Sequence, residues 1–220
     1  KRTALKSNTD AAMLHCSDRV RVLVVKHTGD QTTWIQGRDV DVLAMMEQVG
    51  PDCPPRPMNA EDPLFILYTS GSTGQPKGVV HTTGGYLVQA AVTHHDTFDL
   101  HPESDVFWCT ADVGWVTGHS YIVYGPLLAG ATTVMYEGKP VGTPDAGAFW
   151  RLIEDHRVRS FFTAPTALRA IRRADPEGEL LKAHDLSSLR HFFAAGERLD
   201  PETQRWIEGL LGMPVIDHWW

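Results

Sequence analysis

Cysteine is scarce in this chain of 220 residues, which contains only three. Cys16, Cys53 and Cys109 are odd in number and form no C-x-x-C pair, so the sequence argues against a disulfide-stapled scaffold and against a cysteine-ligated metal. The eleven histidines form no H-E-x-x-H pattern, and we expect them to be surface and packing residues. Free thiols fit a reducing compartment, so we expect a cytoplasmic protein, or a mitochondrial-matrix protein if the source is eukaryotic. Cys109 lies in an apolar run and is expected to be buried.

Basic residues are in the minority: 20 lysines and arginines stand against 27 aspartates and glutamates, which gives a formal net charge of −7. Nucleic-acid-binding proteins normally present a basic face, so no nucleic-acid partner is expected. No apolar run approaches the roughly 18 residues of a membrane span, and no segment has the pattern of a secretory signal peptide. With 42% hydrophobic residues the chain can bury a sizeable core, and we expect its partners to be small molecules.

The most informative segment that is present is Tyr68–Gly78, which follows the apolar run Leu64–Leu67. It contains three glycines, four serine or threonine hydroxyls and one lysine, Lys77. Glycines let the backbone approach a ligand closely, while hydroxyls, backbone N–H groups and a lysine all interact favourably with phosphate oxygens. The segment therefore predicts a polyphosphate-binding loop at the end of a buried strand.

This loop differs from the P-loop of kinases and GTPases. The P-loop needs G-x-x-x-x-G-K-[ST], whereas here Pro76 precedes the lysine and Gly78 follows it. A P-loop phosphotransferase is therefore disfavoured. A flexible, solvated turn remains the alternative interpretation of the segment.

Short apolar runs alternate with helical patterns after the proline-rich stretch 51–63, which predicts an α/β fold with parallel strands. Two helices have start signals, Thr143-Pro144 and Asp200-Pro201, and Gly212 is a stop signal for the second helix. The predicted strands are 20–25, 64–68, 106–109, 132–136, 160–163, 191–195 and 214–217.

Polar motifs follow four of these strands. They are the glycine-rich loop, Ala164-Pro165-Thr166, Gly196-Glu197-Arg198 and the segment that begins at Asp217. In open α/β sheets, ligands bind beyond the carboxyl ends of the strands. We therefore expect all four motifs to converge on one site.

The motifs also resemble a known family. Thr69–Gly78 is similar to the phosphate-binding signature of the adenylate-forming (AMP-binding) superfamily, and within it the chain resembles the short-chain acyl-CoA synthetases. The similarity continues in that family's order through Trp108–Ser120, Thr163–Thr166, Ala195–Arg198 and Asp217–Trp220. It implies part of the N-terminal domain of the adenylate-forming fold, a parallel-rich sheet with flanking helices.

By this resemblance the chain is an internal fragment of a longer protein. We expect 1–50 to be an N-terminal part, 51–63 a linker-like stretch and 64–220 the phosphate- and adenylate-binding part, with the C-terminal lid domain absent. The family continues after Trp220 with Gln-Thr-Glu-Thr-Gly, whose glutamate holds magnesium, so no metal ligand is expected within these residues. The fragment alone is expected to be inactive.

The resemblance implies ATP-dependent ligation of a short-chain carboxylate to CoA through an acyl-adenylate, with release of AMP and pyrophosphate. ATP, Mg²⁺ and CoA would be required. A short carboxylate, with a pKa of about 4 to 5, is already ionised at neutral pH and needs no general base. Catalysis would then depend on positioning and on stabilisation of charge. A nucleotide-binding fragment without catalytic activity is the alternative of another class.

Residue roles follow from the same resemblance. Lys77 and Thr69 would be catalytic, because they would hold the β- and γ-phosphates of ATP. Thr117 would contact CoA in addition to lining the acyl pocket. The residues matching ATP or AMP contacts are Thr69, Ser70, Gly71, Ser72, Thr73, Gly74, Lys77, Gly196, Glu197, Arg198, Asp217, His218, Trp219 and Trp220. Those matching the acyl pocket are Trp115, Val116, Thr117, Ala195 and Trp220.

Two positions bear on the substrate and on the nucleotide. Acetyl-CoA synthetases carry valine where Ala195 stands, whereas propionyl-CoA synthetases carry alanine. The smaller side chain leaves room for about one further substrate methylene, so propionate is favoured over acetate. Simple strand packing is the alternative explanation for Ala195. Many acetyl-CoA synthetases carry proline at the position of Arg198.

Overall fold

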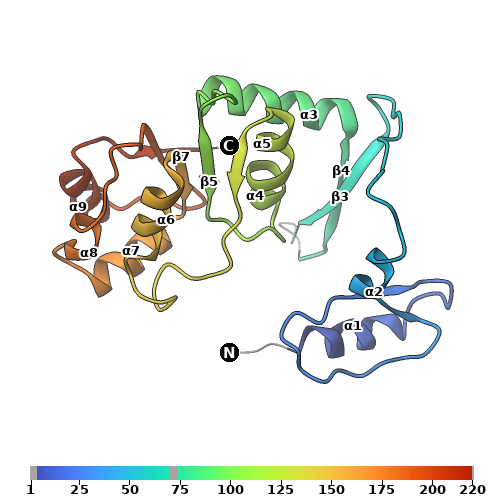
Figure 1. Cartoon of the computed structure of the whole chain (residues 1–220). Helices are drawn as coiled ribbons and strands as arrows, with labels where there is room; N and C mark the ends of the chain where they lie inside the picture. The colour runs from blue at the N-terminus through green and yellow to red at the C-terminus, as the bar shows by residue number, and fades with distance from the viewer. Residues whose placement is uncertain (1–3, 70–73, 220) are drawn as a thin grey trace. The chain divides into compact units, whose positions relative to one another are not determined.

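The computed structural model of the chain describes residues 4–69 and 74–219. They form two compact units, one ending at Pro57 and one beginning at Met58 (Figure 1). Of the described helices, none has the length and apolarity needed to cross a membrane. Some residues with predicted roles lie outside the described residues, namely Ser70, Gly71, Ser72 and Thr73 of the phosphate-binding segment and Trp220 of the acyl pocket.

The first unit has short elements. The strands β1 (Val22–Val24) and β2 (Asp39–Asp41) pair in parallel, which confirms the predicted strand 20–25 over its central residues. The helices are α1 (Leu5–Met13) and α2 (Val42–Met46), and neither contains a buried residue.

A cluster of charges holds this first unit together. The buried carboxylate of Asp39 lies 2.6 Å from Arg38 Nε and 2.8 Å from Lys6 Nζ. The Arg38 guanidinium, with help from Lys6, keeps the pKa of Asp39 below its usual range in spite of burial. Asp10 accepts hydrogen bonds from the same two cations, so one network connects α1 to the start of β2.

The second unit begins with an antiparallel hairpin of β3 (Pro63–Thr69) and β4 (Lys77–Thr82), in which Thr69 pairs with Lys77. Two expectations were wrong here: β3 is not a buried strand, and it does not belong to the parallel sheet. The physical reason is that only one face of β3 is covered. Phe65 packs against Tyr86, with ring centroids 4.9 Å apart, whereas Ile66 on the opposite face is exposed.

The main sheet of the second unit has five strands, all parallel, in the order β6-β5-β7-β8-β9. This confirms the predicted α/β class with a parallel-rich sheet and flanking helices. All five strands fall within or overlap the predicted runs. Their bounds are β5 Val106–Cys109, β6 Thr132–Val134, β7 Val158–Thr163, β8 His191–Ala194 and β9 Ile216–Asp217.

Helices cover both faces of this sheet (Figure 1). One face packs against α6 (Ala148–His156), α7 (Pro165–Ala174) and α9 (Pro201–Leu211), and the short α8 (Glu179–Lys182) lies on the same side. The other face packs against residues from the segment that follows α3 (Thr83–Val92) and from the run of α4 (Val116–Gly118), a π-helical turn η2 (His119–Tyr124) and α5 (Gly125–Leu128).

Adjacent strand residues alternate between these two cores, as the period of two in a strand requires. Phe161 and Phe192 face the α6–α7–α9 side, whereas Phe162 and Phe193 face the other side. All four rings are at most 2% exposed. Each ring buried in this way contributes about 1.5–3 kcal/mol.

A buried histidine occupies the second core, in the π-helical turn η1 (Thr93–Thr97) after α3. His94 is fully buried, and its Nδ1 lies 2.8 Å from the Ala90 carbonyl oxygen, as expected of a packing histidine near a helix end. A Cβ on Gly125 would lie 1.9 Å from His94 Cε1, so only glycine fits there.

The helix-start signals gave one correct and one wrong prediction. Asp200 caps α9 by accepting a 2.9 Å hydrogen bond from the Thr203 backbone N–H, and Gly212 ends the helix with φ +68°. In contrast, α6 begins at Ala148 instead of at Pro144. Thr143 is used in the preceding loop, where its hydroxyl accepts from the Lys139 N–H at 2.9 Å.

Candidate active site

The carboxyl ends of three neighbouring strands form the candidate site. Thr163 of β7 is in register with Ala194 of β8, and Ala194 with Asp217 of β9. Backbone hydrogen bonds extend this pairing just beyond the strands, since the Ala195 N–H donates to the Thr163 carbonyl at 3.1 Å and the His218 N–H donates to the Ala194 carbonyl at 2.8 Å. The segments 163–166, 195–198 and 217–219 are therefore brought together.

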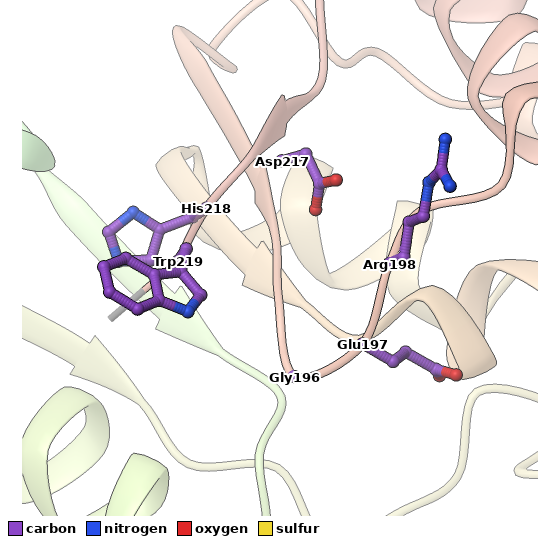
Figure 2. Close-up of a pocket in the computed structure, with 6 residues that line it drawn as sticks. All are labelled: Gly196, Glu197, Arg198, Asp217, His218 and Trp219. Atoms are coloured by element: carbon purple, nitrogen blue, oxygen red, sulfur yellow. The ribbon is translucent and has the colours of Figure 1, made fainter.

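The first cavity at these strand ends is open and has a volume of about 480 Å³. Figure 2 shows Asp217 and Arg198 on one side of it, His218 and Trp219 on the other, and the turn at Gly196 below. Gly196 has φ +97°, in the region that favours glycine, which lets the chain reverse as soon as β8 ends. The lining residues are Gly196, Glu197, Arg198, Asp217, His218 and Trp219.

Two aromatic side chains, His218 and Trp219, line one side of this cavity. Trp219 is 91% exposed and offers a free indole face. His218 packs against Phe162 and Phe193, with ring centroids 5.8 and 5.9 Å away. Burial lowers the pKa of His218 below its ordinary value, so the imidazole is neutral at pH 7. A flat, weakly charged aromatic wall of this kind suits a planar base.

Glu197 borders the first cavity and a second one. Its carboxylate accepts hydrogen bonds from the Thr166 hydroxyl and, at 2.7 Å, from Arg169 Nη2. These two donors lower the pKa of Glu197, with Thr166 as the larger cause, so the side chain is ionised at neutral pH.

The second cavity has a volume of about 330 Å³ and shares Gly196 and Glu197 with the first. It brings together three of the predicted acyl-pocket residues, Trp115, Thr117 and Ala195. Ala195 is 3% exposed, so its methyl group belongs to the wall. The lining residues are Thr110, Ala111, Asp112, Trp115, Thr117, Phe162, Thr163, Ala164, Thr166, Ala195, Gly196 and Glu197.

Of the two other predicted wall residues, Trp220 lies outside the described residues and Val116 lines a different cavity. It lines a third cavity of about 500 Å³, formed with the hairpin and α3, and Thr117 borders both the second and the third cavities. Successive residues of a short helix point in different directions, which explains the separation of Val116 from its neighbours.

Sequence reasoning assigned no role to several lining residues. Thr110 and Thr163 follow or end neighbouring strands, and their hydroxyls are 2.7 Å apart in the second cavity. Asp112 also lines this cavity and accepts from the Gly114 N–H at 2.7 Å. These residues lie at or shortly after the ends of predicted strands, and this position could have identified them as site residues. Cys109 next to them is buried as predicted, and burial raises the pKa of its thiol to about 12.

The phosphate-binding segment does not share this sheet, which corrects the expectation that four motifs follow four strands of it. Thr69 and Lys77 face each other across the β3–β4 hairpin, and Gly74 turns the chain with φ +77°. Both side chains are exposed, and the described linings of the first two cavities do not include them. Within residues 4–69 and 74–219, no cluster of three or more histidine, cysteine, aspartate or glutamate side chains could hold a metal ion.

Comparison with known proteins identifies a family that the sequence matches. The family model described as AMP-binding enzyme matches residues 2–220. The chain is 64% identical over 223 residues to an acetyl-coenzyme A synthetase of Rhodobacter capsulatus, covering 100% of this chain and 33% of that protein. It is 52% identical over 220 residues to an acetyl-coenzyme A synthetase of Syntrophobacter fumaroxidans, covering 98% of this chain and 33% of that protein.

The chain thus spans about a third of the length of the curated relatives it matches. The match nevertheless runs through the parallel sheet, both strand-end cavities and the hairpin. The chain belongs to the family of AMP-binding enzymes.

Proposed function

We propose that this chain is part of an AMP-forming ligase that joins a short-chain carboxylate to CoA through an acyl-adenylate. One observation carries the proposal. The cavity lined by the predicted nucleotide residues and the cavity containing Trp115, Thr117 and Ala195 meet at Gly196 and Glu197. The acyl-adenylate would extend across this boundary, with its nucleotide in the first cavity and its acyl group in the second.

In the proposed reaction, a carboxylate oxygen bonds to the α-phosphorus of ATP, the bond to the bridging oxygen breaks and pyrophosphate leaves. The thiol sulfur of CoA then bonds to the acyl carbon, AMP leaves and the thiol proton passes to solvent. The exposed indole of Trp219 would stack on the adenine, and Asp217 would accept hydrogen bonds from ribose hydroxyls.

For the phosphates we propose Lys77 and Thr69, which form the last strand pair of the hairpin, on either side of the connecting residues 70–76. A lysine in this position can neutralise charge that develops on the leaving pyrophosphate. Magnesium and CoA complete the proposed set of small-molecule partners, with Thr117 in contact with CoA. No described residue is assigned to magnesium. We further propose a cytoplasmic location.

The preferred substrate in this proposal is propionate, with acetate as the alternative. Ala195 is a buried residue in the wall of the second cavity. A valine there would add two methyl groups, which would reduce the space in the cavity because the close-packed residues behind the wall leave no room for it to shift. The relatives' names support a short-chain acid and agree with the acetate alternative, so the preference for propionate rests on Ala195 alone.

Pyrophosphate release by the full-length protein, compared as kcat/KM for acetate, propionate and butyrate, tests the proposal. We expect propionate to lead and Ala195→Val to shift the preference towards acetate by about 10-fold or more, the range that one methylene can give. If acetate leads in the unaltered protein, the second cavity is filled by another residue and the propionate assignment is wrong. No release with any acid would contradict the ligase proposal itself.

A second candidate is a nucleotide-binding module without catalysis. It is favoured by the position of Lys77 on a hairpin outside the parallel sheet. The full-length protein would then bind ATP but release neither pyrophosphate nor phosphate.

A further inference from the structure

We infer that Arg169 is a positioning residue of the candidate site. Acting through Glu197, it holds the loop Gly196–Arg198, which borders both strand-end cavities. The inference rests on the proposed function, because it concerns how this site binds its nucleotide.

Helix α7 holds both oxygens of the Glu197 carboxylate. Arg169 Nη2 lies 2.7 Å from Glu197 Oε2, and the Thr166 hydroxyl donates to Glu197 Oε1. Both donors lie in the first half of α7, whose N-cap residue Ala164 makes no side-chain capping bond, so Glu197 connects the loop to the beginning of this helix.

The loop Gly196–Arg198 has little other support. Gly196 takes φ +97°, and a Cβ placed there would find nothing within 4 Å. Glu197 and Arg198 are both exposed, and the next buried side chain is Leu199. The loop therefore depends on bonds from its side chains more than on packing.

Arg169 connects the middle of this loop to a residue just beyond it. Besides Glu197 Oε2, its guanidinium reaches Asp200 Oδ2 at 3.5 Å, and Asp200 is the N-cap of α9. The planar fork of arginine can bridge two carboxylates in this way, whereas the single ammonium of lysine reaches one of them well.

These contacts suit a positioning role better than a role in stability. The Arg169 and Glu197 side chains are 39% and 41% exposed, and ion pairs as exposed as this contribute little to folding. Holding a loop in one conformation still matters for a ligand, because an unanchored loop must be ordered during binding.

The chain offers a matched control on the same helix. Arg172 lies one turn after Arg169, and its Nη2 is 3.2 Å from Glu202 Oε2 on α9. It makes the same kind of exposed ion pair, yet neither Arg172 nor Glu202 lines the two cavities as described. Arg172→Ala therefore removes a comparable charge and contact without touching the loop.

The experiment compares the unaltered full-length protein with Arg169→Ala, Arg169→Lys and Arg172→Ala. Calorimetry gives the Kd for ATP, pyrophosphate release gives the KM for ATP and kcat, and thermal unfolding gives Tm. We expect Arg169→Ala to raise both Kd and KM for ATP about 3- to 10-fold, the effect of losing a charge-assisted hydrogen bond at a half-exposed site. Arg169→Lys should restore part of this loss.

A merely structural role would give a different pattern. It would lower Tm and the amount of active enzyme, hence the apparent kcat, and leave KM unchanged. Arg169→Ala values of Kd and KM within twofold of those of Arg172→Ala would overturn the inference. ATP binding that weakens as expected in a protein releasing no pyrophosphate would support the positioning role and contradict the proposed function alone. If the unaltered protein bound no ATP, both would be wrong.

Discussion

Replacing Asp105 with alanine should destabilise the protein strongly, although the residue is far from the strand ends that form the site. Asp105 stands just before β5, and its side chain has no exposed surface. It lies 2.8 Å from Arg190 Nη2 and 3.1 Å from Arg159 Nε, and both arginines belong to the amino-terminal side of neighbouring strands. It also accepts from the His101 backbone N–H at 3.0 Å and from the Ser104 hydroxyl at 2.9 Å.

The magnitude follows from these partners. Removing one member of a buried, hydrogen-bonded charge network costs about 3–5 kcal/mol where the remaining charges cannot regain water. The Arg159 and Arg190 side chains are 40% and 29% exposed, so we take the lower end of this range, about 3 kcal/mol. For a chain of this size, each kcal/mol lost from the free energy of unfolding lowers Tm by roughly 2–4 °C. We therefore expect Asp105→Ala to lower Tm by roughly 6 °C or more in thermal unfolding followed by fluorescence.

The effect should depend on pH in a defined direction. Burial alone would raise the pKa of Asp105, but the His101 N–H, the Ser104 hydroxyl and the two arginines together lower it. A carboxyl group with a lowered folded-state pKa stabilises the protein above its unfolded pKa of about 4, and this contribution disappears as the pH falls through the folded value. The difference between the unaltered protein and Asp105→Ala should thus be full at pH 7 and shrink below pH 4. A Tm at pH 7 within 1 °C of the unaltered protein would refute the reasoning.

Two further predictions concern buried positions. Gly125→Ala should lower the free energy of unfolding by about 1–3 kcal/mol, because the new Cβ would lie 1.9 Å from a His94 ring that packs against Phe98 and Phe107. Thermal unfolding measures this loss, and an unchanged Tm would mean that the His94 ring can move. In native protein, a thiol reagent followed by peptide mass mapping should label the exposed Cys16 and Cys53 and spare Cys109, whose thiol pKa burial raises to about 12; rapid native labelling of Cys109 would contradict its burial.

Much of the sheet could be predicted from the sequence because its strands are short apolar runs that stop at polar motifs. β5 was predicted with its observed bounds, Val106–Cys109. The predicted bounds of β7 and β8 differ from the observed ones by only one or two residues at one end. The cap at Asp200 was also predictable, since a capping side chain acts within three residues of its own position.

What could not be predicted depends on contacts between distant segments. The run Leu64–Leu67 looks like a fully buried strand, yet only tertiary packing decides that one of its faces stays exposed. The bond between the Thr110 and Thr163 hydroxyls joins residues 53 positions apart, and no local pattern indicates it. The anchoring of Glu197 by Arg169 likewise spans 28 positions.

The most direct test of the central claim follows the oxygen atoms of the substrate. The full-length protein is supplied with ATP, CoA and a short-chain acid labelled with ¹⁸O in its carboxylate, and the nucleotide product is analysed by mass spectrometry. Attack of the carboxylate on the α-phosphorus predicts AMP that carries one labelled oxygen, together with unlabelled pyrophosphate. Unlabelled AMP, or ADP with the label in inorganic phosphate, would contradict an acyl-adenylate spanning the two cavities.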